Sequence, residues 1–346
     1  MEKFAMITFP DSGLKSVQKS RFLERLPKKA TTLYKYMIGP QPIDTILDRK
    51  SMVELGKIYN IPTLHYNGEN FIFERRERQL SLLIKSLKDN DIGILSAPFI
   101  HDIFSAREIS TLNKNGIYVL DTNHYHILTL YTCMPELIKI LGRQLPYIEV
   151  GIWRADTELG KAWVHMLSPY INKMTIGGES LDELYTLASK ILRGTGLSCQ
   201  VTTDPSHCMN KKDLLINTEY MPGMEHRGEI DILSYPLDIQ KANKALKGLS
   251  FYSGNLELPC DAKVNISLNP WEHLALSNSL LYILNGSYRE LVLNRTLDKR
   301  TFNKFIRIIK KHKLRPRGVA NGYEIVSYDR FRMIYYKNSS SSKKVG

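Results

Sequence analysis

Hydrophobic and polar positions between residues 147 and 218 alternate between two periodicities. Short runs of apolar, β-favouring residues predict buried strands at Tyr147–Trp153, Met174–Ile176, Leu197–Thr203 and Leu214–Thr218. Between these runs, apolar residues recur at helical spacing in two stretches, 159–170 and 181–191. Strands that alternate with helices of this length predict right-handed crossovers and a parallel sheet.

Residues that start and stop helices support this pattern. Ser180-Leu-Asp-Glu183 has the spacing of a capping box, in which the serine accepts from a backbone N–H and the glutamate reaches back. Gly194 stands where a left-handed residue would end that helix. Asp204-Pro205 predicts the start of a short helix, because proline is tolerated at the first helical position.

The flanking segments have their own periodicity. Upstream, the pattern predicts strands at Lys3–Phe9, Ile92–Ser96 and Gly116–Leu120, broken helical sequence at Leu14–Leu26, a loop at Gly39–Pro42 and a helix around Leu80–Leu87. Downstream, it predicts a strand at Glu229–Tyr235, short strands at Leu256–Leu258 and Val264–Leu268, a helix at Trp271–Asn285 that stops at Gly286, and a helix with its apolar stripe at Phe302, Phe305, Ile306 and Ile309.

These patterns predict an α/β protein. A central Rossmann-like parallel sheet domain is expected at 144–256, beside an N-terminal α/β domain at 1–143. The segment 257–335 is expected to pack its helices back on the N-terminal domain, and 336–346 is expected to be a disordered tail because it is rich in serine.

Composition narrows the class of protein. The chain has 346 residues, of which 43% are hydrophobic and 24% charged, and no apolar run is long enough to span a bilayer. The four cysteines, at 133, 199, 208 and 260, lack CxxC spacing and predict reduced thiols in a cytoplasmic protein.

The formal net charge of +13 favours acidic partners, namely nucleic acid, an anionic membrane surface or an acidic carrier protein. Much of the excess lies between Lys299 and Arg317. A solvated helix face is the favoured interpretation of this run, and a dedicated binding surface is the alternative. No RNP, zinc-finger or other nucleic-acid-binding motif accompanies this charge. The sequence does not determine the oligomeric state.

The first turn of the central domain, Gly151 to Gly160, is where a phosphate loop would lie. Such a loop needs glycines so that the backbone can approach the pyrophosphate, and here only Gly160, the packing glycine, is in place. Arg154 and Thr157 replace the other glycines, and Asp156 adds a negative charge. Glu179, after the second strand, fits either a ribose ligand or a helix-entry charge.

Candidate site residues follow from the ends of the predicted strands. The candidate NAD or NADP ligands, for which weak or absent binding is expected, are Gly151, Trp153, Arg154, Gly160, Glu179 and Thr218. The candidate substrate residues, after the strand ending at Leu120, are Asn123, His124 and Tyr125. A cleft between the domains is expected to bring Trp153, Arg154, Thr218 and Glu219 opposite Asn123 and Tyr125.

The pair His124 and His126 has no third ligand in sequence, so no metal site is predicted. A helix cap with surface histidines is the favoured interpretation.

In its order of segments, the chain resembles the Rossmann proteins related to shikimate dehydrogenase and glutamyl-tRNA reductase, and especially the long-chain acyl-carrier-protein reductases. Several segments of the chain are similar to segments of that family. They are the opening strand, Thr122-Asn-His-Tyr-His126, the domain 147–236, Leu258–Asn265, the helix Leu274–Gly286 and Leu293–Thr296. The resemblance implies NAD(P)-dependent reduction of an acyl group delivered by a carrier protein.

The chain departs from that family at the residues that would carry out the reductase reaction. The resemblance implies a nucleophilic cysteine where this chain has Ala275, and Cys260 is the nearest cysteine and a weak substitute. Three functions remain open. They are a divergent relative with lost or altered reductase chemistry, an active NAD(P)-dependent oxidoreductase with an atypical phosphate loop, and a basic, non-enzymatic interaction protein.

Overall fold

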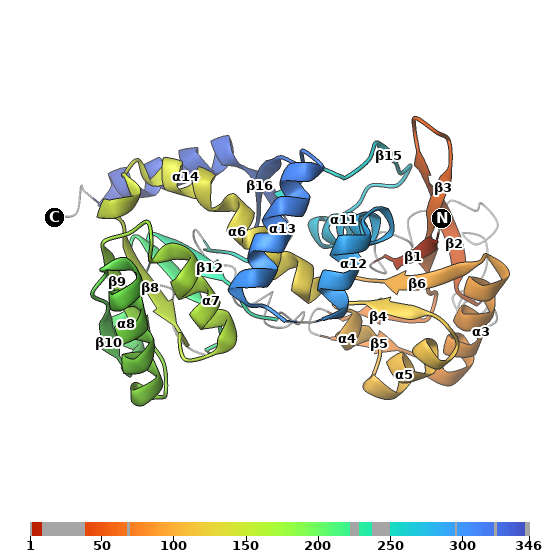
Figure 1. Ribbon diagram of the computed structural model, residues 1–346. Coiled ribbons are helices and arrows are strands. Elements are labelled where there is room, and N and C mark those ends of the chain that lie inside the picture. The colour runs from red at the N-terminus through yellow and green to blue at the C-terminus, as the bar shows by residue number, and fades with distance from the viewer. Residues whose placement is uncertain are drawn as a thin grey trace. The chain divides into compact units, whose positions relative to one another are not determined.

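The computed structural model describes residues 2–8, 39–67, 70–221, 228–236, 250–294, 296–321 and 324–342 (Figure 1). These residues form two compact units. The first contains the described residues of 2–125 and 258–289, and the second contains the described residues of 126–236, 250–257 and 290–342. No helix within these ranges is long and apolar enough to cross a membrane.

The first unit is built on a mixed six-stranded sheet. Its strands are β1 (Lys3–Ile7), β2 (Gln41–Asp48), β3 (Glu54–Asn60), β6 (Ile92–Ser96), β7 (Tyr118–Leu120) and β15 (Ala262–Lys263), in the order β15-β2-β3-β1-β6-β7. The strands β3, β1, β6 and β7 are parallel, whereas β2 and β15 join antiparallel. A hairpin, β4 (Leu64–Tyr66) and β5 (Phe71–Phe73), and the helices α3 (Arg76–Asp89), α4 (Ile100–Ile103), α5 (Ala106–Lys114) and α11 (Pro270–Leu284) complete the unit.

The second unit contains the parallel sheet that the sequence predicts. Its strands are β8 (Glu149–Trp153), β9 (Lys173–Gly177), β10 (Gln200–Thr202), β11 (Leu214–Asn217), β12 (Ile230–Leu233) and β13 (Ser250–Phe251). Numbered along the chain from β8, their spatial order is 3-2-1-4-5-6, which is the Rossmann order, and every neighbouring pair is parallel. The predicted α/β class with a central Rossmann-like sheet is therefore confirmed.

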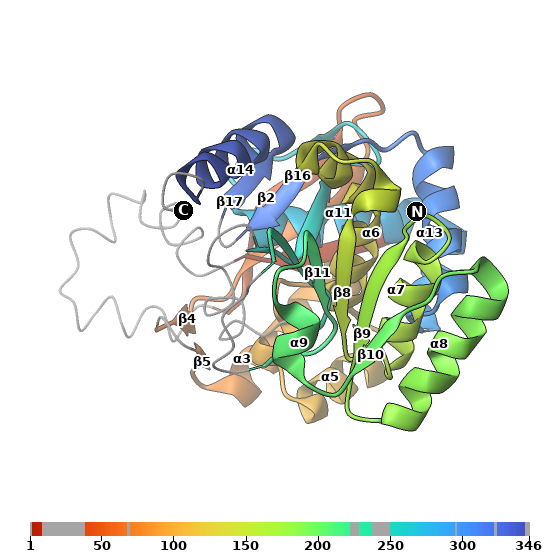
Figure 2. The same cartoon turned by 90° about the vertical axis from the view of Figure 1, so that its left-hand side faces the viewer.

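Helices cover both faces of this sheet. They are α7 (Glu158–Leu167), α8 (Leu181–Thr195) and α9 (Pro205–Met209), and Figure 2 shows α9 on the face opposite to α7 and α8. The unit also contains η2 (Leu145–Tyr147), α13 (Lys299–Lys311), α14 (Tyr328–Ser342) and a small antiparallel sheet of β14 (Ser253–Leu256), β16 (Pro316–Asn321) and β17 (Glu324–Ser327). The helices α6 (Thr122–Leu141) and α12 (Gly286–Leu293) each begin in the first unit and continue into the second.

Capping residues fix where the helices of the second unit begin. Thr157 Oγ1 accepts from the Gly160 amide at 3.1 Å, and Asp204 accepts from the Ser206 amide at 2.9 Å. At α8, Ser180 accepts from the Glu183 amide at 3.4 Å, but the Ser180 amide donates to Asp156 instead of Glu183. Only the serine half of the predicted capping box is therefore formed.

The buried indole of Trp163, on α7, is the centre of an aromatic cluster in the second unit. Its ring centroid lies 5.7 Å from that of Tyr131 on α6 and 5.6 Å from that of Phe302 on α13. The indole Nε1 donates to Ser234 Oγ at 2.7 Å, which satisfies its one polar atom. This cluster fixes α13 by its apolar side, since burial of a phenylalanine contributes about 1.5–3 kcal/mol.

Several local expectations are wrong. Residues Asn123 to His126 lie in the first turns of α6, and both histidines are buried, whereas surface histidines beside a helix cap were expected. Residues 41 and 42 belong to β2, where a loop was expected. The helix α11 stops before Gly286 as expected, but Gly286 also begins a further helix, α12, which was not expected. The left-handed residue after α8 is Gly196, with φ 79°, whereas Gly194 lies inside the helix.

Further differences lie at the ends of elements. No strand forms at 264–268, and Ile308 takes the place of Ile306 in the buried stripe of α13. The helix α14 continues to Ser342, where a disordered tail was expected from 336. The broken helix predicted at Leu14–Leu26, and residues 343–346, lie outside the described residues.

The division of the chain differs from the sequence-based boundaries. It assigns 258–289 to the first unit and 290 onward to the second, so α13 and α14 belong with the parallel sheet. The boundaries proposed from sequence at 143, 256 and 335 stay a proposal.

Candidate functional site

The carboxyl ends of β8, β9 and β11 meet at one edge of the parallel sheet. This is the edge at which doubly wound proteins bind their ligands, and β8 and β11 are the two strands between which the strand order reverses. The turn after β8 contains Arg154, the turn after β9 contains Glu179, and Thr218 and Glu219 follow β11. The structure thus brings these four predicted residues together.

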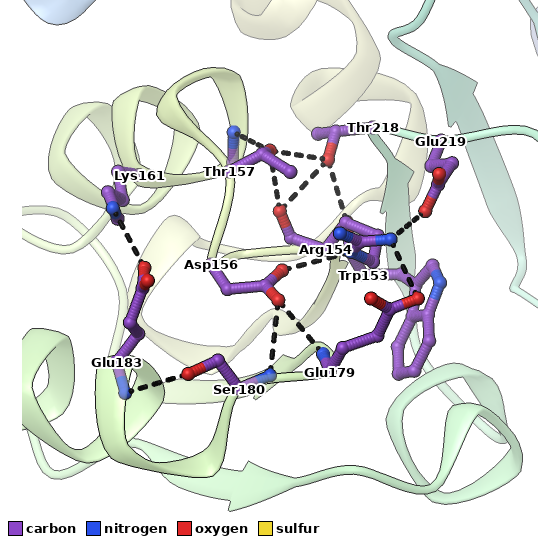
Figure 3. A network of polar contacts seen from close by, with 11 residues as sticks. Trp153, Arg154, Asp156, Thr157, Lys161, Glu179, Ser180, Glu183, Thr218 and Glu219 are labelled. Atoms are coloured by element: carbon purple, nitrogen blue, oxygen red, sulfur yellow. Dashed lines mark hydrogen bonds and ion pairs between the residues drawn. The ribbon is translucent and has the colours of Figure 1, made fainter.

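Arg154 is the centre of a network of ion pairs at this edge (Figure 3). Its Nε donates to Asp156 Oδ1 at 3.1 Å, and its Nη1 donates to Glu179 Oε1 at 3.0 Å and to Glu219. One guanidinium therefore faces three carboxylates, and the edge of the sheet carries a negative excess in an otherwise basic protein.

The backbone of Arg154 is left-handed, with φ 58°. This region suits glycine and costs most other residues about 1–2 kcal/mol. The position therefore has the conformation of a phosphate-loop glycine while carrying a long cationic side chain. Two threonines hold the peptide, because Thr157 Oγ1 and Thr218 Oγ1 donate to the Arg154 carbonyl oxygen at 2.8 and 3.1 Å.

Asp156 connects this turn to the start of α8. Its Oδ2 accepts from the Glu179 and Ser180 amides at 2.9 and 3.3 Å. Burial acts to raise the Asp156 pKa, but these amides and the Arg154 guanidinium outweigh it and hold the pKa below its usual value. The close approach requires Gly178, because a Cβ there would lie 2.6 Å from Asp156 Cγ.

The neighbouring carboxylates also keep the Arg154 guanidinium protonated. Burial acts to lower the Arg154 pKa, and Asp156, Glu219 and Glu179 together raise it above its usual value. A second cation, Lys161 on α7, pairs with Glu158 and Glu183 at 3.2 and 3.1 Å.

The glycines in this region serve packing. A Cβ at Gly160 would lie 2.6 Å from Ala155 Cα, so α7 can approach the turn only with glycine there. A Cβ at Gly151, inside β8, would lie 3.0 Å from Lys212 Cγ and would also meet the Cys208 carbonyl oxygen of α9. Gly160 therefore has the packing role that the sequence predicts.

Two buried polar atoms at the same edge were not predicted. Within the described part of the chain, Trp153 Nε1 and Asn217 Oδ1 have no hydrogen-bond partner. Trp153 and Asn217 are paired residues of β8 and β11, and both are about 96–97% buried, with relative exposures of 3% and 4%. Buried polar groups are usually paired, so these two atoms are available to water or a polar ligand. The ring of Trp153 otherwise packs against Cys208, Met209 and Leu215.

The predicted substrate residues lie in the first unit. The Asn123 amide donates to Asp121 Oδ1 at 2.9 Å, and the Tyr125 hydroxyl lies 2.6 Å from Ser277 Oγ on α11. Tyr125 is 1% exposed, so its ring belongs to the core of this unit. A substrate role for Asn123, His124 and Tyr125, and a cleft that joins them to Arg154, stay predictions.

Cys260 and Ala275 also lie in the first unit. Burial, followed by the charges of Asp48 and Asp261, raises the pKa of Cys260 to about 11. Ala275 is fully buried on α11. Among the described residues, no three histidine, cysteine or carboxylate side chains are grouped as they would be to hold a metal ion.

Comparisons with known proteins give no family. No family model matches the chain, and no curated protein matches it. Among solved structures, L-tryptophan dehydrogenase from Nostoc punctiforme is similar at 12% identity and a TM-score of 0.38, over 99% of this chain and 89% of that one. Quinate dehydrogenase from Corynebacterium glutamicum in complex with NAD is similar at 11% identity and a TM-score of 0.27, over 88% of this chain and 99% of that one. Likenesses of this degree do not bear on function, so the function is argued from the residues. The relation to acyl-carrier-protein reductases stays a prediction.

Proposed function

We propose that this protein is a divergent, Rossmann-fold relative of the NAD(P)-dependent acyl reductases in which tight dinucleotide binding and the reductase chemistry are lost or altered. The observation that carries the proposal is the position of the Arg154 guanidinium, which is bonded to Asp156, Glu179 and Glu219 across the ends of three strands. These strand ends are where this fold would hold a pyrophosphate and a ribose.

The residues at this turn do not fit a dinucleotide. A pyrophosphate needs backbone N–H groups that it can approach closely, and the side chain of Arg154 extends from the residue that begins the turn. Glu179, the candidate ribose ligand, is paired with Arg154. The three carboxylates around one guanidinium also oppose a doubly charged diphosphate.

The thiol chemistry of the related reductases lacks support as well. Ala275 is buried and has no nucleophilic atom, and the raised pKa of Cys260 leaves little thiolate at neutral pH. Both features support lost or altered chemistry.

The alternative function is an active NAD(P)-dependent oxidoreductase in which Arg154 is itself a cofactor ligand. The observation that favours it is that Arg154 reaches Glu179 and Glu219 from a position whose left-handed backbone suits a glycine. A guanidinium that exchanged these carboxylates for the cofactor phosphates would form strong, charge-assisted hydrogen bonds.

Titration of the purified protein with NADPH and NADH, followed by nicotinamide fluorescence, separates the two functions. The proposal predicts no saturable binding by the wild type at micromolar cofactor, and tighter binding by Arg154→Gly combined with Thr157→Gly. Arg154→Lys is the matched control, because it retains the charge and most of the bulk and should bind no better than the wild type. Wild-type binding at micromolar concentration that is abolished by Arg154→Lys would contradict the proposal and establish the alternative.

A further inference from the structure

The solvent face of α13, Lys299–Lys311, is almost purely cationic. Seven of its residues are exposed, and six of them carry positive charge, with Asn303 as the exception. The six cations are Lys299, Arg300, Lys304, Arg307, Lys310 and Lys311. We define these six residues as the α13 basic face. Arg300, Lys304, Arg307 and Lys311 follow one another at intervals of three or four residues, so they form a straight row along the helix.

The opposite side of the helix is fixed in the core of the second unit. Phe302, Phe305, Ile308 and Ile309 are buried, and Phe302 packs in T-shaped contact against Tyr131 and at a tilt against Trp163. The apolar side of α13 is therefore not available to insert into a lipid bilayer.

The carboxylates of the described residues do not neutralise the α13 basic face. Within the described part of the chain, none of its six cations forms an ion pair with a carboxylate. The acid nearest in sequence, Asp298, is the N-cap, and it accepts from the Thr301 amide at 2.8 Å. Lys299 and Arg300 lie in the first turn, where the helix dipole disfavours cations, and like charges four residues apart repel. A face used only for solubility would mix both signs at no such cost.

The positive region extends beyond α13. Burial lowers the pKa of His165 on α7, and the charges of Lys299 and of Lys190 on α8 lower it further. Lys190 is also exposed. Cations of two helices therefore act on one imidazole, and the positive potential of Lys299 reaches α7.

We propose that the α13 basic face binds the phosphate backbone of a nucleic-acid duplex without reading its sequence. Neighbouring cations in the row lie about 5–6 Å apart along the helix axis, from a rise of 1.5 Å per residue. A rigid row of charges at this spacing suits the regular charge of a duplex, in which phosphate contacts and counterion release supply most of sequence-independent affinity.

Other anionic partners fit less well. A specific protein interface needs aromatic or apolar anchors, and the exposed positions of α13 contain none. A single-stranded nucleic acid would need exposed aromatic rings for stacking, whereas both phenylalanines of α13 are buried. An anionic bilayer would meet charge alone, since the apolar side of the helix is covered.

The test uses the full chain and a fluorescein-labelled DNA duplex of mixed sequence, about 20 base pairs long, with fluorescence anisotropy across a salt series. Wild-type affinity should fall with salt with a slope of about −3 to −4, as expected when about four phosphates are neutralised. Arg307→Gln with Lys311→Gln should weaken binding at least tenfold and make the slope shallower by about 2. A duplex of unrelated sequence should bind equally well.

The matched control is Lys85→Gln with Lys114→Gln, which removes the same charge from exposed positions of the first unit. This variant should retain wild-type affinity, and circular dichroism should show both variants folded. Equal weakening in the two variants would overturn the proposal, because binding would then reflect net charge alone. Binding to vesicles of phosphatidylserine and phosphatidylcholine without binding to the duplex, or tighter binding to the single strand, would also overturn it.

Discussion

Arg154 Nη1 lies 3.0 Å from Glu179 Oε1, although the two residues are 25 positions apart in the chain. The contact joins the turns that follow β8 and β9, and the left-handed backbone of Arg154 places its side chain among the carboxylates there. A position that favours glycine is thus occupied by arginine, and the ion pairs and hydrogen bonds around it offset the backbone strain. The relationship makes Arg154 a structural residue as well as a candidate obstacle to a cofactor.

Arg154→Met should destabilise the second unit by about 1.5–3 kcal/mol, because Asp156 would lose its charged hydrogen-bond donor. The Asp156 side chain is only 7% exposed, so water cannot fully replace the guanidinium. Glu179→Gln should cost less than about 1 kcal/mol, because the Glu179 side chain is 73% exposed and its pair is screened. Urea unfolding at neutral pH measures both. Equal losses in the two variants would show that Asp156 does not depend on Arg154.

Gly160→Ala should destabilise the protein by about 1–3 kcal/mol, as overpacking does. The added Cβ would lie 2.6 Å from Ala155 Cα, and a backbone atom can move only if the turn itself moves. Gly194→Ala is the control, since no atom lies within 4 Å of a Cβ placed there inside α8. This substitution should stabilise by about 0.5–1 kcal/mol through helix propensity. A neutral result for Gly160→Ala in thermal unfolding would remove the packing role of this glycine.

Much of the parallel sheet could be predicted because its information is local. Strand and helix periodicity and the proline after Asp204 each act within a few residues, and strands that alternate with helices predict right-handed crossovers and a parallel sheet. The sequence-based predictions were wrong where residues distant in the sequence determine the local structure. Asp156 takes the Ser180 amide that the capping box assigned to Glu183, and no local pattern announces a partner 24 residues away.

The sequence predicted which residues lie at the candidate site, but not which of them contact one another. The loss of glycines at Arg154 and Thr157 is visible in sequence, whereas the triple pairing of Arg154 depends on how three strand ends meet. Trp153 Nε1 and Asn217 Oδ1, which lack a hydrogen-bond partner among the described residues, had no sequence signal, because burial is a property of the whole fold. The pair Gly177-Gly178 was a sequence signal that could have indicated this close approach, because a side chain at position 178 would collide with Asp156.

Cys260 should not form an acyl adduct when the protein is incubated with an acyl thioester near neutral pH. Burial and the carboxylates of Asp48 and Asp261 raise its pKa to about 11, so the reactive thiolate is scarce. Intact-protein mass spectrometry measures the adduct, with Cys260→Ser as the control. An adduct on the wild type that is absent from Cys260→Ser would restore the thiol chemistry of the related reductases.

Asp231 makes the stability of the second unit depend on pH. It lies on β12, where burial raises its pKa to about 7, although the Gly228 amide and the Ser250 hydroxyl act to lower it. The folded state therefore retains a proton on Asp231 at pH values where the unfolded chain, with a pKa of about 3.9, has released it. Because the folded state binds more protons between these two pKa values, the contribution of Asp231 to stability falls as the pH rises from about 4 to about 7 and is constant above that.

Asp231→Asn should remove this dependence, since an amide does not ionise. Relative to the wild type, the variant should gain about 1–3 kcal/mol of unfolding free energy between about pH 5 and about pH 8. Comparing the two proteins at each pH cancels the opposite trend of carboxylates such as Asp156 and Glu108, whose pKa values are lowered. Urea unfolding at both pH values measures the difference. An equal difference in unfolding free energy between variant and wild type at the two pH values would show that Asp231 is already ionised in the folded protein below pH 5. Its hydrogen bonds would then lower its pKa by more than burial raises it.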